Sequence, residues 1–197
     1  MLGPRSVLIE GERIRDVSPG HASLEGAQVI DLAALTCLPG LIDAHTHITS
    51  ESGHGGALVA TLSAGEFVAE KAKLPDYFSP TVRTKAATIG PQLLSSFTRA
   101  YKAGPKIAVG TDAGVYLHGD NAHEFQLMVS GGMPATEALQ TATVHAAELL
   151  RMRADIGSLE AGRYADVIAV EGDPSRDVGV LREVAFVMKG GIVHRQP

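Results

Sequence analysis

The chain has 197 residues, of which 17 are Lys or Arg and 22 are Asp or Glu, so its formal net charge at neutral pH is −5. With 45% hydrophobic and 20% charged residues, it is not an intrinsically disordered chain, because such chains are poor in apolar residues and rich in net charge. The acidic balance argues against a nucleic-acid-binding surface, which needs clustered Lys and Arg. The length fits one domain, or one domain with a small satellite.

The two ends of the chain predict a small β-unit. Residues 6–16 indicate a hairpin whose turn contains Gly11, because glycine adopts the positive φ that tight hairpins need. Further short strands are expected at residues 28–31, 36–38, 166–171, 184–188 and 192–194. Isolated hairpins are marginally stable, so the strands of both ends should pack together. Residues 1–39 and 160–197 are therefore predicted to form one composite unit resembling a β-sandwich.

The middle of the chain, residues 40–159, predicts strands that alternate with helices, which is typical of βα architecture. A helix at 81–103 is expected to break at Gly90 and Pro91, since proline disrupts helix interiors. The expected strands cover residues 56–62 and 106–109, and the expected helices cover residues 64–73, 81–103, 121–130 and 136–151.

The number of cysteines and the hydropathy of the chain indicate where in the cell the protein is expected. Cys37 is the single cysteine, so no intrachain disulfide can form, and a reducing cytoplasmic location is expected. No segment approaches the ~18–20 consecutive apolar residues of a membrane-spanning helix. We expect neither a membrane nor a nucleic acid as partner.

The first candidate site is His45-Thr46-His47, which follows an apolar segment. In a strand, side chains alternate between faces, so both imidazoles would project from the same side. Two neutral imidazoles placed together can bind a divalent transition metal. The alternative, favoured for this motif alone, is a pair of exposed histidines on an edge strand.

The second candidate site is Asp112, which follows the predicted strand at 106–109 and precedes glycine-containing backbone. A carboxylate at such a strand end can bind a metal or accept a proton from metal-bound water. An aspartate that only caps the next turn would give the same pattern, and the motif alone does not separate the two.

Four segments stand out: PGLIDAHTH at 39–47, GTDAG at 110–114, TATVHAAELL at 141–150 and GSLEAGRYADVIAVEGDP at 157–174. Together they resemble the amidohydrolase superfamily, whose members fold as metal-bearing (β/α)₈ barrels. The run from 110 to 125, GTDAG followed by HGDNAHEF, is similar to the branch that holds imidazolonepropionase-like enzymes and Xaa-Pro dipeptidases.

The resemblance implies roles for individual residues. His45, His47 and Asp112 would bind a divalent metal, with Zn²⁺ first and Mn²⁺, Co²⁺ or Fe²⁺ as alternatives. Asp112 would also be the catalytic base, taking a proton from metal-bound water and passing it to the leaving amine. His118 is a weak candidate for substrate contact, with an ordinary surface histidine slightly favoured. His123 and the other helical histidine, His145, are expected to serve packing or face solvent.

The resemblance also implies parts that this sequence lacks. Residues 40–159 amount to 120 residues, whereas a (β/α)₈ barrel usually needs about 250. The family's carboxylated lysine and two further metal-binding histidines find no counterpart, because Lys71, Lys73 and Lys85 fall in helical contexts and His54 lies among glycines. We therefore expect an α/β fold with a partial or internally deleted TIM-type barrel, its joint near residues 52–56, and exposed strand edges that favour homo-oligomers.

Two functions follow. The first is a metal-dependent hydrolase that cleaves amide-type C–N bonds in a small cyclic amide, a dipeptide or a related small molecule with metal-activated water. The second is a non-catalytic amidohydrolase-like fragment or scaffold with an incomplete metal site.

Overall fold

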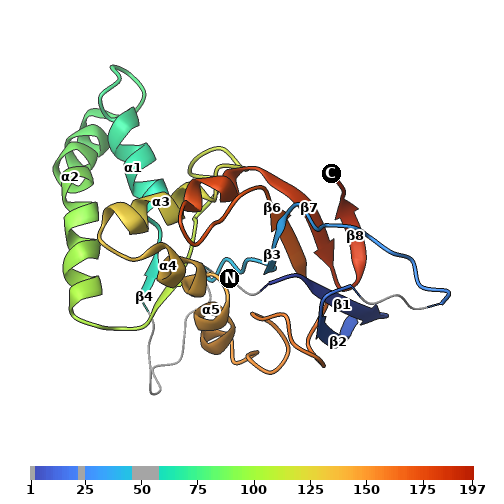
Figure 1. Cartoon of the computed structure of the whole chain (residues 1–197). Coiled ribbons are helices and arrows are strands. Elements are labelled where there is room, and N and C mark those ends of the chain that lie inside the picture. The colour runs from blue at the N-terminus through green and yellow to red at the C-terminus, as the bar shows by residue number, and fades with distance from the viewer. Residues whose placement is uncertain (1–2, 22–24, 46–57) are drawn as a thin grey trace.

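The structure is a computed structural model that describes residues 3–21, 25–45 and 58–197. Helices α1 (Leu62–Lys71) and α2 (Pro80–Lys102) stand at one side of the molecule, and the strands of both chain ends lie at the other (Figure 1). Three shorter helices lie between them: α3 (His123–Ser130), α4 (Ala135–Thr141) and α5 (Val144–Leu149) (Figure 1). The chain is therefore a mixed α/β protein, as the sequence predicts.

The N-terminal hairpin forms where it is predicted. Strand β1 (Arg5–Glu10) pairs antiparallel with β2 (Arg13–Pro19). Gly11 lies in the turn with a φ of 59°, a conformation that favours glycine. The local sequence thus determines this turn.

Strands from both ends of the chain share one antiparallel sheet in the order β3-β6-β7-β8, confirming four predicted strands. A small core that includes Phe186 packs against Ile14 of the hairpin, and the Ile14 amide donates to the Arg163 carbonyl at 2.9 Å. The four strands are β3 (Thr36–Pro39), β6 (Val167–Val170), β7 (Val184–Lys189) and β8 (Ile192–Arg195).

The prediction of a strand at residues 28–31 is wrong. These residues form no strand, and Val29 is 74% exposed. The carboxylate of Asp31 accepts a hydrogen bond from the Ala33 amide at 2.9 Å. Such local side-chain bonds favour turns and end an extended segment.

A second, parallel arrangement carries the βα part of the chain. Strand β4 (Leu58–Ala60) pairs parallel with β5 (Ile107–Val109), in agreement with the strands expected there. Residues 41–45 run beside β5, since the Ala44 amide donates to the Val109 carbonyl at 2.9 Å. The described residues form no closed barrel, and the predicted joint at 52–56 lies outside them.

Helices α1 (Leu62–Lys71) and α2 (Pro80–Lys102) connect β4 to β5. The predicted break in α2 is wrong, because the helix continues through Pro91. Gly90 serves close packing instead: a Cβ there would lie 2.3 Å from Cβ of Ala69 on α1. The glycine therefore marks a helix contact and not a helix end.

The helix predicted at 136–151 is in fact two helices, which follow α3 (His123–Ser130). They are α4 (Ala135–Thr141) and α5 (Val144–Leu149). At the break between them, the Ala142 carbonyl accepts a hydrogen bond from the Ile42 amide at 2.8 Å. The carbonyl thus bonds to the segment that leads to His45 instead of to a continuing helix.

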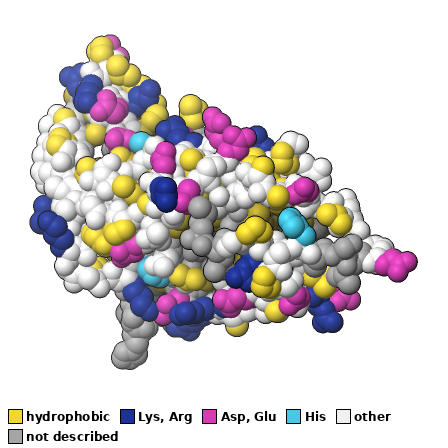
Figure 2. All heavy atoms as spheres, in the orientation of Figure 1, with side chains coloured by type: hydrophobic (Ala, Val, Ile, Leu, Met, Phe, Trp, Pro, Cys, Tyr) yellow, Lys and Arg dark blue, Asp and Glu magenta, His cyan; other side chains and the backbone are white. Residues whose placement is uncertain are grey.

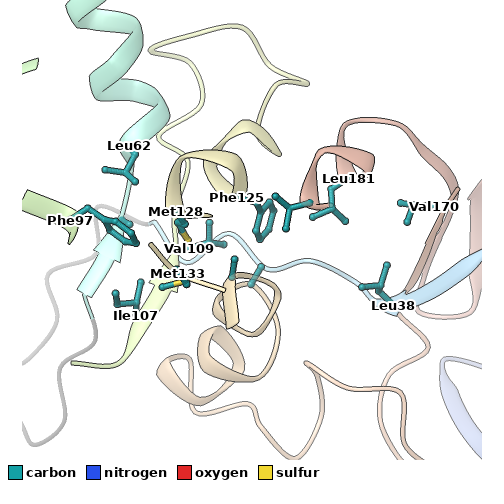
Figure 3. Packing of buried hydrophobic residues seen from close by; sticks show 14 of the residues in the cluster. Leu38, Leu62, Phe97, Ile107, Val109, Phe125, Met128, Met133, Val170 and Leu181 are labelled. Atoms are coloured by element: carbon teal, nitrogen blue, oxygen red, sulfur yellow. The ribbon is translucent and has the colours of Figure 1, made fainter. Parts of the chain in front are cut away.

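One hydrophobic core joins the two sides of the molecule. It runs from Phe97 on α2 past Val109 and Phe125 to Leu181 of a short 3₁₀ helix (Val178–Arg182) and to Val170 on β6 (Figure 3). On the face shown in Figure 2, basic and acidic side chains are interspersed. Among the helices of the described ranges, none has the length and apolar character needed to span a bilayer.

Candidate active site

The structure brings His45 and Asp112 together. His45 lies in the segment that runs beside β5, and Asp112 follows Val109, the last residue of β5, by three positions. The His45 Nε2 lies 3.4 Å from the Asp112 Oδ1, and the two side chains are 27% and 36% exposed. Both side chains are thus close to each other and partly exposed, while the His45 Nε2 atom itself is buried.

Gly110 makes this approach possible. A Cβ at position 110 would lie 2.6 Å from Cβ of His45 and 2.6 Å from Cγ1 of Val59. Any side chain there would force the segments apart. The glycine of the GTDAG motif is therefore required by the packing of three adjacent backbones.

Asp43 and Thr111 stand next to the pair, and the sequence reasoning missed both. The Asp43 Oδ1 accepts the His45 amide at 3.0 Å and the Thr111 amide at 3.2 Å. The Asp43 Oδ2 accepts the Thr111 hydroxyl. Asp43 lies two residues before His45, and Thr111 lies one residue before Asp112, each within a motif quoted above. Their positions in the sequence do not show that the two side chains meet.

The other predicted residues lie elsewhere. His47, like His54 and the joint, falls outside the described residues. His118 is exposed in the loop between β5 and α3, and within the described part of the chain no hydrogen bond or ion pair links it to His45 or Asp112. His145 packs at the back of β5, with its Nδ1 3.1 Å from the Ile107 carbonyl oxygen.

His123 contacts the carboxylate of Glu66 on α1. Its Nε2 lies 2.6 Å from the Glu66 Oε2 and its Nδ1 lies 3.1 Å from the Gln126 Oε1. Burial disfavours the charged ring, but the bonds to Gln126 and Glu66 outweigh burial and raise the pKa of His123. His123 therefore joins α3 to α1, in line with a packing role.

Glu124 is a fully buried carboxylate close to the strand ends. Its two oxygens accept the amides of Leu62 and Ser63, each at 2.7 Å, at the start of α1. Burial raises the pKa of Glu124, while the bonds from Ser63 and Leu62 oppose that rise. The Glu124 carboxylate thus accepts two amides at the start of α1 that have no hydrogen-bond acceptor within the helix.

The donor set fits part of a metal site. Two ligands about 2.0–2.1 Å from a tetrahedral ion stand roughly 3.3 Å apart, and the His45 Nε2 and Asp112 Oδ1 are 3.4 Å apart. Among residues 3–21, 25–45 and 58–197, no three His, Cys, Asp or Glu side chains are arranged to hold one ion. The described chain thus supplies two fitting donors.

A cavity of about 370 Å³ lies beside the Asp43–Thr111 contact. Apolar residues such as Leu41 and Phe125 line much of it, and the guanidinium groups of Arg182 and Arg195 contribute positive charge. Arg182 is already paired with the Asp120 carboxylate.

The chain is similar to several solved structures. A Xaa-Pro dipeptidase with methionine bound in its active site is 52% identical, with a TM-score of 0.68, over 70% of this chain and 34% of that one. A prolidase complexed with N-methylphosphonate-L-proline is 26% identical, with a TM-score of 0.64, over 73% and 36%. Ochratoxinase from A. niger is 34% identical, with a TM-score of 0.53, over 68% and 32%.

These matches cover only about a third of the length of the solved relatives. The search of curated proteins gives no match. The family model for the amidohydrolase family matches residues 84–195, which is more than half of the chain and includes Asp112. The chain therefore belongs to the amidohydrolase family.

Proposed function

We propose that this chain carries part of the active site of a metal-dependent hydrolase that cleaves amide-type C–N bonds. The observation that carries the proposal is the pair formed by His45 and Asp112, whose side-chain nitrogen and oxygen lie 3.4 Å apart close to the end of β5. Membership of the amidohydrolase family supports a hydrolytic reaction.

In this proposal His45, His47 and Asp112 hold a divalent metal, with Zn²⁺ preferred over Mn²⁺, Co²⁺ or Fe²⁺. A bound metal of this kind lowers the pKa of a water molecule to about 7 and polarises a carbonyl oxygen. The Asp112 carboxylate accepts a proton from the water molecule and delivers it to the leaving amine. Its partial exposure leaves room for that exchange.

The substrate we propose is a dipeptide, with small cyclic amides as a related class. The Xaa-Pro dipeptidase and the prolidase among the structural relatives support this choice. His118 lies in the loop after Asp112, where it remains a weak candidate for substrate contact.

A second function is favoured by one observation: within the described residues only two metal donors converge. On this hypothesis the chain is a non-catalytic scaffold that keeps the fold elements but binds metal weakly. Self-association into a homo-oligomer would then be its main interaction.

Metal content separates the two hypotheses. The purified chain is loaded with Zn²⁺, desalted and analysed by elemental mass spectrometry, and Xaa-Pro dipeptide cleavage is followed by amine release. One bound metal per chain and cleavage that a chelator abolishes support the hydrolase. His45→Ala should lose both, while His194→Ala, an exposed histidine on β8, serves as the matched control. A metal-free chain without turnover would favour the scaffold.

A further inference from the structure

The carboxylate of Asp43 joins the two segments that carry the candidate pair. It accepts the backbone amide of His45 on one segment and the backbone amide of Thr111 on the other. It also accepts the Thr111 hydroxyl. Hydrogen bonds to an ionised acceptor are stronger than neutral ones, so this single side chain fixes both backbones immediately beside the pair.

Thr111 extends this arrangement to both sides of Asp112. Its hydroxyl oxygen accepts the Ala113 amide and the side-chain amide of Asn121, each at 3.3 Å. Asp112 itself has a φ of 52°, in the left-handed region that non-glycine residues rarely adopt. Such a conformation persists where the surroundings impose it, and here the Ala113 amide, just after Asp112, donates to the hydroxyl of Thr111, just before it.

The spacing of the segments leaves little tolerance. Because Gly110 has no room for a Cβ against His45, the two backbones already approach as closely as glycine allows. A shift of either segment would change the His45–Asp112 distance directly. The hydrogen bonds that Asp43 accepts from the His45 and Thr111 amides oppose such a shift. They act on the backbone of His45 itself and on the residue just before Asp112.

We propose that Asp43 is a positioning residue that sets the distance between His45 and Asp112 through Thr111, without touching the substrate. This inference rests on the proposed function for its catalytic consequence. The hydrogen bonds themselves do not depend on that function, so they can be tested in the metal-free chain.

The first experiment measures amide hydrogen exchange by NMR in the full chain and in Asp43→Asn. Asparagine keeps the size of the side chain, but its NH₂ group replaces the Oδ2 that accepts the Thr111 hydroxyl. Its remaining oxygen can accept the His45 and Thr111 amides only as a neutral group, which forms weaker hydrogen bonds than a carboxylate. The amides of His45 and Thr111 should exchange at least ~10-fold faster, with little change along β4 and β5. The matched control is Asp31→Asn, since Asp31 also accepts a backbone amide, that of Ala33, and should affect only that one.

A second pair of variants tests the role of the hydroxyl. Thr111→Val keeps the shape of the side chain and removes the three hydrogen bonds of its hydroxyl, to Asp43, Ala113 and Asn121. The Ala113 amide should therefore also lose protection. Thr111→Ser keeps the hydroxyl and should lose less protection than Thr111→Val. Unchanged exchange at His45 and Thr111 in Asp43→Asn, or loss spread evenly over the chain, would overturn the inference.

Turnover provides the catalytic readout. If the wild-type chain cleaves dipeptides, Asp43→Asn should lower kcat about 10- to 100-fold with little change in KM, because the pair is displaced while substrate contacts remain. A raised KM with unchanged kcat would contradict positioning. If the wild-type chain neither binds Zn²⁺ nor turns over, the proposed function fails, and the exchange data still decide whether Asp43 holds the two segments.

Discussion

The β-layer, comprising the β1–β2 hairpin and the β3-β6-β7-β8 sheet, differs from the βα region of residues 58–159 in how each is stabilised. The β-layer is antiparallel, and each of its strands pairs with at least one neighbouring strand. The parallel pair β4–β5 has three residues in each strand and depends on surrounding helices. The candidate pair of His45 and Asp112 lies beside the β4–β5 pair of the βα region.

The distribution of buried polar side chains sharpens this contrast. In the part of the chain that the structure describes, the buried polar and charged residues are Ser63, Thr111, Glu124, Thr141 and Thr143, all in the βα region. Burying polar groups costs free energy unless each is hydrogen-bonded. The region that carries the candidate pair is thus also the one that buries polar side chains, and Thr111 among them adjoins the pair.

The largest expected effect is on activity. Asp112→Asn keeps the shape of the side chain but removes its charge and its ability to take a proton, so kcat/KM should fall by roughly 10²- to 10⁴-fold. The unfolding free energy should change little. Dipeptide turnover and urea unfolding measure the two effects. Asp166→Asn in the β-layer is the control, since Asp166 bonds to Lys189 and the Gly190 amide and should affect stability alone.

The second effect is on folding of the β-layer. Phe186 is 1% exposed in the core behind the sheet, and Phe186→Ala should lower the unfolding free energy by about 3–5 kcal/mol. Because one core runs from Phe97 to Val170, we expect a single urea transition for both regions. Two separate transitions, by circular dichroism and tyrosine fluorescence, would show that the regions fold independently.

The third effect concerns α2 of the βα region. Pro91 lacks the amide that would bond within the helix, and proline in a helix interior costs about 3 kcal/mol relative to alanine. Pro91→Ala should therefore raise the unfolding free energy by up to about 3 kcal/mol. Thermal and urea unfolding would show this, and a lower Tm would mean that Pro91 contributes packing that alanine cannot replace.

The smallest effect is a pH dependence from Glu124. Burial raises its pKa in the folded chain, so the folded state binds this proton more tightly than the unfolded state. Its contribution to stability is present below the ordinary pKa of a glutamate and is lost as the pH rises through the raised value. Between the ordinary pKa of a glutamate and the raised pKa of Glu124, the unfolding free energy of Glu124→Gln should therefore fall less with rising pH than that of the wild type.

Urea unfolding at several pH values tests this prediction. The exposed Glu25 provides the control variant, Glu25→Gln. Parallel pH profiles for the wild type and Glu124→Gln would show that the amides of Leu62 and Ser63 compensate the burial of the carboxylate.

The sequence by itself determined the local elements and the motif residues. The turn at Gly11, four strands of the antiparallel sheet and the strand before Asp112 follow from glycine conformation and hydrophobic pattern, which act over a few residues. The same patterns, through the resemblance they carry, identified His45 and Asp112 as candidates.

Only the tertiary structure decided which distant residues meet. The continuous helix across Pro91, the break at Ala142 and the role of Asp43 depend on neighbours far along the chain. Asp43 and Thr111 are 68 positions apart, and no local pattern encodes their contact. It forms because residues 41–45 pack beside β5, an arrangement that Gly110 permits by having no side chain.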